Sequence, residues 1–254
     1  MSKAVFLVAG RGSRLKGHTD EQPKCLLPIG GRPILEWSLE HMRRAGIDDI
    51  TLVGGYRSER LSGYDTDLRI NTHWAQTNMV RTLLCATDIL AHSSTIVSYG
   101  DILYTPDILQ ALSEAPGDIT ITYDTKWLDL WVARFADPLE DAEQFETRDG
   151  LLQRIGGRAV HVEEIGGQYM GLLKFEPEGW RKVRDVLSGL SEASIDQLDM
   201  TSLLSKLLHQ NISVHTVPVS GGWIEVDTPE DRDLAERIAA GQPGSCEHDW
   251  RASP

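Results

Sequence analysis

Cysteines, basic residues and long apolar runs are all scarce in this sequence. The three cysteines, Cys25, Cys85 and Cys246, are scattered and odd in number, which favours neither a disulfide framework nor a zinc cluster. A formal net charge of −13 argues against a broad basic face for nucleic acid or an anionic membrane. No apolar run is long enough to cross a bilayer, and no signal-peptide pattern precedes the first one. We therefore expect a cytoplasmic protein with no nucleic-acid partner and no membrane partner.

The 254 residues, 41% of them hydrophobic, are enough to bury a large core. Uniformly apolar runs alternate with amphipathic ones, which is typical of a mostly parallel sheet covered by helices on both faces. We predict one α/β domain over residues 1–240 and a flexible tail over 241–254; the pattern blurs between about 127 and 165. The predicted strands cover 5–9, 49–53, 95–99, 119–123, 169–175 and 213–218, and the predicted helices cover 34–45, 77–89, 106–114, 179–187, 200–209 and 228–240.

A glycine-rich turn with two arginines follows the first predicted strand. Glycines let backbone N–H groups approach an anion closely, and arginines add fork-shaped contacts to phosphate oxygens. The spacing fits neither a dinucleotide-binding fingerprint nor a Walker loop. It predicts a cradle for a nucleoside triphosphate, with Lys24 neutralising charge on the reacting phosphoryl group. An ordinary strand–helix loop is the alternative. The cradle comprises Ala9, Gly10, Arg11, Gly12, Ser13 and Arg14.

Three carboxylates are candidates for a magnesium site. Asp101 follows the third predicted strand, at the strand end where ligands bind in open α/β sheets. Glu225 and Asp227 flank one apolar residue, so on an extended segment both side chains point to one face. Hard oxygen donors on one face suit Mg²⁺. The alternatives are a Gly-Asp turn at 100–101 and a solvated edge strand at 225–227.

Other residues have weaker signals. Asn78 begins a predicted helix and either caps it or contacts a base or ribose. The aromatic residues Tyr123, Trp127 and Trp131 recur at intervals of four, which is typical of a core, although such a wall can also face a cationic headgroup. The eight histidines lack ligand spacing and have no assigned role.

The motifs taken together resemble those of the nucleotidyltransferase family, over about residues 4–235. The matching segments are Gly10-Arg11-Gly12-Ser13-Arg14-Leu15, Pro23-Lys24, 28–33, Gly100-Asp101 and 225–231. The short chain, together with Asn78-Met79, Thr82-Leu83, the 134–143 segment and 169–172, is similar to the phosphocholine and phosphonate cytidylyltransferase branch. Lys16-Gly17-His18 departs from the family pattern, in which a proline is common. The resemblance implies a Rossmann-like, GT-A-like mixed sheet with a small acceptor-binding subdomain, the acceptor-side insertion at about 124–168.

The resemblance also implies roles for individual residues. The catalytic group is Lys24 with Arg14 and Arg11, and Asp101, Asp227 and Glu225 hold Mg²⁺. The implied nucleotide-binding residues are Ala9, Gly10, Gly12, Ser13, Tyr56, Gln76, Asn78 and Thr82. A choline-type acceptor favours Trp127, Trp131 and Asp129, whereas a small acidic phosphonate favours Arg134, Lys126 and Lys174; Tyr169 is a further acceptor-side candidate.

The expected reaction joins CMP from CTP to a small phosphonate, such as phosphonoformate or hydroxyethylphosphonate, and releases pyrophosphate. Phosphocholine and a sugar 1-phosphate are the alternative acceptors. A nucleotide-sensing module without turnover is the alternative outside enzymes. The second subdomain could supply a homodimer contact.

Overall fold

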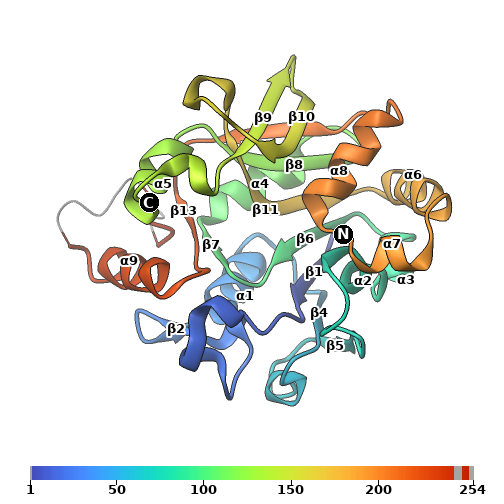
Figure 1. Ribbon diagram of the computed structural model, residues 1–254. Helices are drawn as coiled ribbons and strands as arrows, with labels where there is room; N and C mark the ends of the chain where they lie inside the picture. The colour runs from blue at the N-terminus through green and yellow to red at the C-terminus, as the bar shows by residue number, and fades with distance from the viewer. Residues whose placement is uncertain (1, 243–247, 252–254) are drawn as a thin grey trace.

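The computed structural model describes residues 2–242 and 248–251, and its main feature is one mixed β-sheet (Figure 1). The strand order is β5-β4-β1-β6-β11-β8-β12-β10-β9. Strands β5, β4, β1 and β6 are mutually parallel, β12 runs parallel to β8, and β11 and β10 pair antiparallel with both of their neighbours. The sheet strands are β1 Lys3–Val8, β4 Ile50–Gly54, β5 Asp67–Ile70, β6 Thr95–Tyr99, β8 Ile119–Asp124, β9 Glu143–Arg148, β10 Leu151–Arg158, β11 Gln168–Phe175 and β12 His215–Val219.

Helices cover both faces of the sheet because the central strands are apolar on both. In β1, Ala4, Phe6 and Val8 enter one hydrophobic cluster, whereas Val5 and Leu7 enter the other. Helices α1, α4, α5 and α9 contribute to the first cluster, and α2, α3, α6, α7 and α8 contribute to the second. The helices are α1 Ile34–Arg44, α2 Met79–Leu84, α3 Thr87–Leu90, α4 Pro106–Glu114, α5 Trp127–Arg134, α6 Pro177–Ser188, α7 Glu192–Asp196, α8 Met200–His209 and α9 Pro229–Ala239.

The predicted α/β class with a sheet flanked by helices is therefore confirmed, and several element boundaries differ. The single helix predicted over 77–89 is two helices, α2 and α3, which are separated at Cys85 and Ala86. The region where the pattern blurs contains α5 and the antiparallel β9–β10 hairpin, which extends the sheet at the edge opposite β5 (Figure 1).

Two short ladders lie beside the main sheet and position the site. β7 Ile102–Tyr104 pairs antiparallel with β13 Trp223–Glu225, so that Glu225 lies opposite Ile102. The backbone N–H of Val226 also donates to the carbonyl of Asp101, 2.9 Å away. This ladder brings together the two acidic segments that the sequence separates widely. The second ladder joins β2 Pro28–Ile29 to β3 Arg32–Pro33.

Part of the predicted flexible tail is packed against the domain. His248 and Trp250 are fully buried, and the Trp250 ring meets Trp37 edge-on, with ring centroids 6.4 Å apart. His248 Nδ1 lies 3.1 Å from the carbonyl oxygen of Trp223. For residues 248–251 the prediction of a loose tail is therefore wrong, since aromatic burial fixes them; 243–247 and 252–254 lie outside the described residues.

Cys25 and Cys85 are free thiols, and Cys246 lies outside the described residues. Within 2–242 and 248–251, none of the helices has the length and apolar character needed to span a bilayer.

Candidate functional site

The turn after β1 brings Lys24 across the glycine-rich segment. Gly12 has a φ of +71°, and a Cβ atom there would lie 2.8 Å from the Lys24 side chain, so the close approach requires glycine. Gly10 lies on the wall of the neighbouring pocket, and Ser13 begins a 3₁₀ helix. Arg11 points to Asp20, with its Nη2 2.7 Å from the carboxylate.

Lys24 joins two of the three predicted metal-binding carboxylates. Its Nζ lies 2.6 Å from Asp101 Oδ2 and also contacts Asp227 Oδ1. Arg14, which is exposed, contacts the other oxygen of Asp227. Burial alone would lower the pKa of Lys24, but the charges of Asp101, Asp227 and Glu225 outweigh it and raise the pKa well above its ordinary value. Lys24 is therefore a fully charged ammonium inside an acidic cluster.

The three carboxylates form a compact oxygen set. Asp101, Glu225 and Asp227 each offer one oxygen, and these oxygens all lie within 4.8 Å of one another. Burial, followed by the charge of Asp227, raises the pKa of Glu225 to about 8. Burial also acts to raise the pKa of Asp227, but Lys24 outweighs it and the pKa is lowered. Asp101 Oδ1 is buried without a hydrogen-bond partner among the described residues. An orphaned carboxylate oxygen beside two further hard donors fits Mg²⁺.

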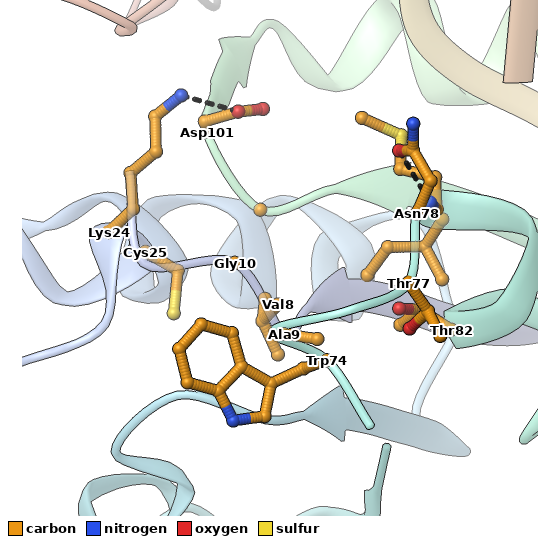
Figure 2. Close-up of a pocket in the computed structure, with 13 residues that line it drawn as sticks. Val8, Ala9, Gly10, Lys24, Cys25, Trp74, Thr77, Asn78, Thr82 and Asp101 are labelled. Atoms are coloured by element: carbon orange, nitrogen blue, oxygen red, sulfur yellow. Dashed lines mark hydrogen bonds and ion pairs between the residues drawn. The ribbon is translucent and has the colours of Figure 1, made fainter. Parts of the chain in front are cut away.

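A pocket of about 200 Å³ opens beside Lys24 and Asp101, and its far wall is formed by Trp74 (Figure 2). Gly55 makes this wall possible, since a Cβ there would lie 2.6 Å from the Trp74 Cβ. Asn78 and Thr82 lie along the side of the pocket. The lining residues are Leu7, Val8, Ala9, Gly10, Lys24, Cys25, Trp74, Thr77, Asn78, Met79, Thr82, Gly100 and Asp101.

Four predicted nucleotide-binding residues therefore share this pocket, namely Ala9, Gly10, Asn78 and Thr82. Asn78 also caps α2, because its Oδ1 accepts from the Met79 N–H at 2.8 Å, as the capping interpretation expects.

The remaining residues predicted for the nucleoside lie around this pocket. Tyr56 stacks edge-on against Trp74, with ring centroids 5.3 Å apart, and its hydroxyl donates to the carbonyl of Asp20. The carbonyl of Gln76 accepts from the Gln197 side chain at 3.1 Å. Their contact with a nucleoside stays a prediction.

A second pocket, of about 170 Å³, lies on the other side of the carboxylate cluster and is strongly acidic. Asp141 and Glu143 face it together with Glu225 and Asp227. Burial raises the pKa of both Asp141 and Glu143. Aromatic rings complete the wall. The lining residues are Tyr99, Trp131, Asp141, Glu143, Gln168, Tyr169, Met170, Gly171, Thr201, Trp223, Glu225 and Asp227.

Two acceptor-side predictions, those for Lys174 and Arg134, need correction. The Lys174 ammonium donates to the carbonyls of Ser113, at 3.3 Å, and Ala115, at 2.5 Å; Lys174 pairs in register with Ile96 and so lies toward the start of β6, away from the site. The Arg134 side chain is 1% exposed and binds carboxylates within the protein. Both cationic side chains thus bind groups within the protein, and the sequence did not reveal these contacts.

The aromatic stripe divides between core and site. Trp127 is buried in the hydrophobic core, as the core interpretation of the stripe expects, whereas Trp131 also faces the acidic pocket. Tyr169 faces this pocket, and its ring meets Tyr99 edge-on at 5.9 Å.

Lys126 precedes α5, where its backbone N–H donates to Asp124 at 2.8 Å. Contact of Lys126 with an acceptor stays a prediction.

Sequence reasoning missed other residues of the site. Asn71 Nδ2 donates to the hydroxyls of Thr77 and Thr82, at 3.0 and 3.1 Å, and so fixes one pocket wall. Asp141 and Glu143 lie within a segment that the resemblance includes, although the resemblance implies no role for them. Their acidity beside the aromatic stripe was the available signal.

Comparison with known proteins identifies the family to which the chain belongs. The family model of the MobA-like NTP transferase domain matches residues 4–161. This chain belongs to that family. The nucleotidyltransferase resemblance seen in the motifs is thereby confirmed, and with it the transferase class of this NTP transferase.

Two relatives and one solved structure extend the comparison. The NTP transferase is 34% identical to a CTP:phosphoglutamine cytidylyltransferase of Campylobacter jejuni, over 91% of this chain and 98% of the relative. It is 32% identical to a CMP-5′-(3-aminopropyl)phosphonate synthase of Streptomyces rubellomurinus, over 45% of this chain and 19% of that protein. The solved CTP:phosphocholine cytidylyltransferase of Streptococcus pneumoniae has the same fold, with a TM-score of 0.71, 20% identity and coverage of 93% of this chain and 98% of that one.

Proposed function

We propose that this NTP transferase is a magnesium-dependent cytidylyltransferase. It joins CMP from CTP to the phosphate or phosphonate group of a small acceptor that also carries nitrogen, and it releases pyrophosphate. The observation that carries the proposal is the position of the Lys24–Asp101–Asp227 cluster between two pockets. The pocket beside Trp74 takes the nucleoside, and the acidic pocket takes the acceptor.

The reaction needs alignment and charge neutralisation more than proton transfer. A phosphate monoester has its second pKa at ~6, so the attacking dianion of such an acceptor is abundant at neutral pH and requires no general base. Lys24 stabilises charge on the α-phosphate during in-line attack, while Arg14 and the Gly10–Ser13 turn hold the departing pyrophosphate. Asp101, Asp227 and Glu225 hold Mg²⁺, which when bound neutralises phosphate charge.

The charge of the second pocket favours an acceptor with a nitrogen-bearing end. Asp141 and Glu143 repel a compact trianion such as phosphonoformate and attract an ammonium or amide group. Trp131 and Trp223 line the same pocket, and aromatic rings attract a cationic group. Phosphoglutamine, the substrate that names the Campylobacter relative, is our first candidate, and an aminoalkyl phosphonate is the second, since the Streptomyces relative is named for one.

A substrate panel with pyrophosphate release as the readout tests this function. CTP is incubated with phosphoglutamine, aminopropylphosphonate, phosphocholine, hydroxyethylphosphonate, phosphonoformate and glucose 1-phosphate, with Mg²⁺ or with EDTA. We expect release with the nitrogen-bearing acceptors and none with EDTA. Activity with glucose 1-phosphate alone refutes the acceptor class, and CTP binding with no release for any acceptor supports a nucleotide-sensing module instead. Replacing CTP by ATP, GTP or UTP tests whether the protein selects cytosine as the base of its nucleotide.

A further inference from the structure

Arg134, the last residue of α5, ties two acidic residues to one guanidinium. Its Nε lies 2.8 Å from Asp231 Oδ1, and its Nη2 lies 3.2 Å from Asp231 Oδ2. The same Nη2 lies 3.2 Å from Glu225 Oε2. The side chains of Arg134 and Asp231 are both 1% exposed. Because a guanidinium presents its donors in a rigid fork, this geometry fixes the direction of both carboxylates.

Asp231 in turn fixes the backbone that carries Asp227. Its Oδ2 accepts from the backbone N–H groups of Asp227 and Thr228, at 3.0 Å each. The Thr228 hydroxyl accepts from the Asp231 N–H at 3.1 Å, which closes a capping box at the start of α9. The short segment between β13 and α9 is therefore held at both ends, and Asp227 projects from it toward Lys24.

We infer that Arg134 is a positioning residue for the metal site, acting on Glu225 directly and on Asp227 through Asp231. This inference rests on the proposed magnesium-dependent function. Arg134 belongs to the predicted acceptor-side insertion. The segment beside the acceptor pocket therefore positions the carboxylates that hold Mg²⁺. Partners that orient metal ligands without touching the metal are a recurring feature of metal sites.

A lysine cannot replace this arginine. It keeps the positive charge but has a single nitrogen, which cannot contact Asp231 in bidentate fashion and Glu225 at once. Arg134→Lys thus separates geometry from charge. Asp231→Asn tests the same path from the other side, because an asparagine oxygen can still accept from the Asp227 and Thr228 N–H groups.

Binding of Mn²⁺ in the presence of CTP, followed by electron paramagnetic resonance, gives a readout that does not depend on turnover. We expect Arg134→Lys and Asp231→Asn to weaken Mn²⁺ binding by ~10–100-fold. Their turnover is expected to recover as Mg²⁺ is raised, which general loss of folding would not allow. The control is Arg181→Met, which removes a two-point Arg–Glu pair with Glu178 on α6 and is expected to leave Mn²⁺ binding unchanged. Arg134→Met is included, with circular dichroism to report its folding.

The outcomes separate the inference from the function on which it rests. If the unaltered protein binds Mn²⁺ but both Arg134→Lys and Asp231→Asn bind it equally well, the positioning role is refuted and the metal site stands. If the unaltered protein binds no Mn²⁺ with CTP present, the metal site fails and the positioning role fails with it.

Discussion

The ammonium nitrogen of Lys24 lies 2.6 Å from a carboxylate oxygen of Asp101, although 77 positions separate the two residues. The same nitrogen contacts Asp227, so one cation links two acidic segments. An incoming nucleotide therefore meets a lysine whose charge is fixed and whose position is set by two partners.

Removing the Lys24 charge is expected to lower kcat more than it raises KM for CTP. Lys24→Met should reduce kcat by ~10²–10³-fold, by analogy with the loss of one preorganised donor at an oxyanion. Pyrophosphate release measures the change. Lys182→Met is the matched control, since it removes a half-exposed lysine that pairs with Asp118 on the sheet's other side. Near-normal turnover of Lys24→Met contradicts the assigned role.

The nucleoside pocket should be sensitive to one added methyl group. An alanine Cβ at Gly55 would lie 2.6 Å from Trp74 Cβ and 2.8 Å from the Ala9 carbonyl oxygen, so Trp74 must move. We expect Gly55→Ala to raise KM for CTP by ~10-fold, because overpacking of about 1–3 kcal/mol acts on the binding wall. KM for the acceptor should change little. Gly63→Ala, where a Cβ meets open space, is the control; equal effects of the two variants would refute this pocket assignment.

The acidic pocket should select the acceptor's nitrogen-bearing end. Asp141→Asn and Glu143→Gln remove negative charge at nearly constant shape, and each is expected to raise KM for that acceptor by ~10-fold, since charged hydrogen bonds contribute about 1.5–3 kcal/mol. KM for CTP should stay the same. Glu146→Gln, on an exposed position of the same strand β9, is the control. A rise in KM for CTP alone would contradict the assignment of this pocket.

Glu225 gives the metal-free protein a specific pH dependence. Burial, with the charge of Asp227, raises the pKa of Glu225 from 4.5 to about 8, so the folded protein holds this proton more tightly than the unfolded chain does. Its stabilising contribution is thus fully present below pH 4.5 and is lost as the pH rises through about 8. Glu225→Gln stays neutral and should gain Tm relative to the unaltered protein between about pH 5 and about pH 9.

Thermal unfolding in EDTA measures this difference. Each 1 kcal/mol corresponds to a Tm shift of ~2–4 °C for a domain of this size. A Tm difference between Glu225→Gln and the unaltered protein that is the same at about pH 5 and about pH 9 would show that the pKa of Glu225 is not raised in the folded protein.

Sequence pattern predicted the parts of the fold that local rules decide. The strand at 95–99 and the helices at 106–114 and 200–209 have the predicted bounds, since a buried run, a proline at the first turn of α4 and the Asp199 cap of α8 act locally. The β9–β10 hairpin was missed even though Asp149 and Gly150 form its turn with positive φ. Asp-Gly between two extended runs was a usable signal there.

Side-chain roles were predictable where sequence neighbours or the common edge of the parallel strands decide them. Asp101 and the glycine-rich turn could be expected to lie together, because both follow parallel strands that end at one sheet edge. Asp227 reaches them through the β7–β13 ladder, which lies outside the main sheet. The partners of Arg134 and Lys174 could not be expected, because Asp231 lies 97 positions from Arg134, and the carbonyls that accept from Lys174 lie 59 and 61 positions away. Charge pattern alone does not tell an internal ion pair from a ligand contact.

The packing of His248 under Trp223 has a practical consequence for handling the protein. Trp223 forms part of the acceptor pocket wall, and β13 continues from it to Glu225. Shortening the chain before His248 would remove the fully buried His248 ring beside Trp223 and the fully buried Trp250 ring that packs on Trp37. Any engineered change of acceptor preference should therefore retain residues 248–251.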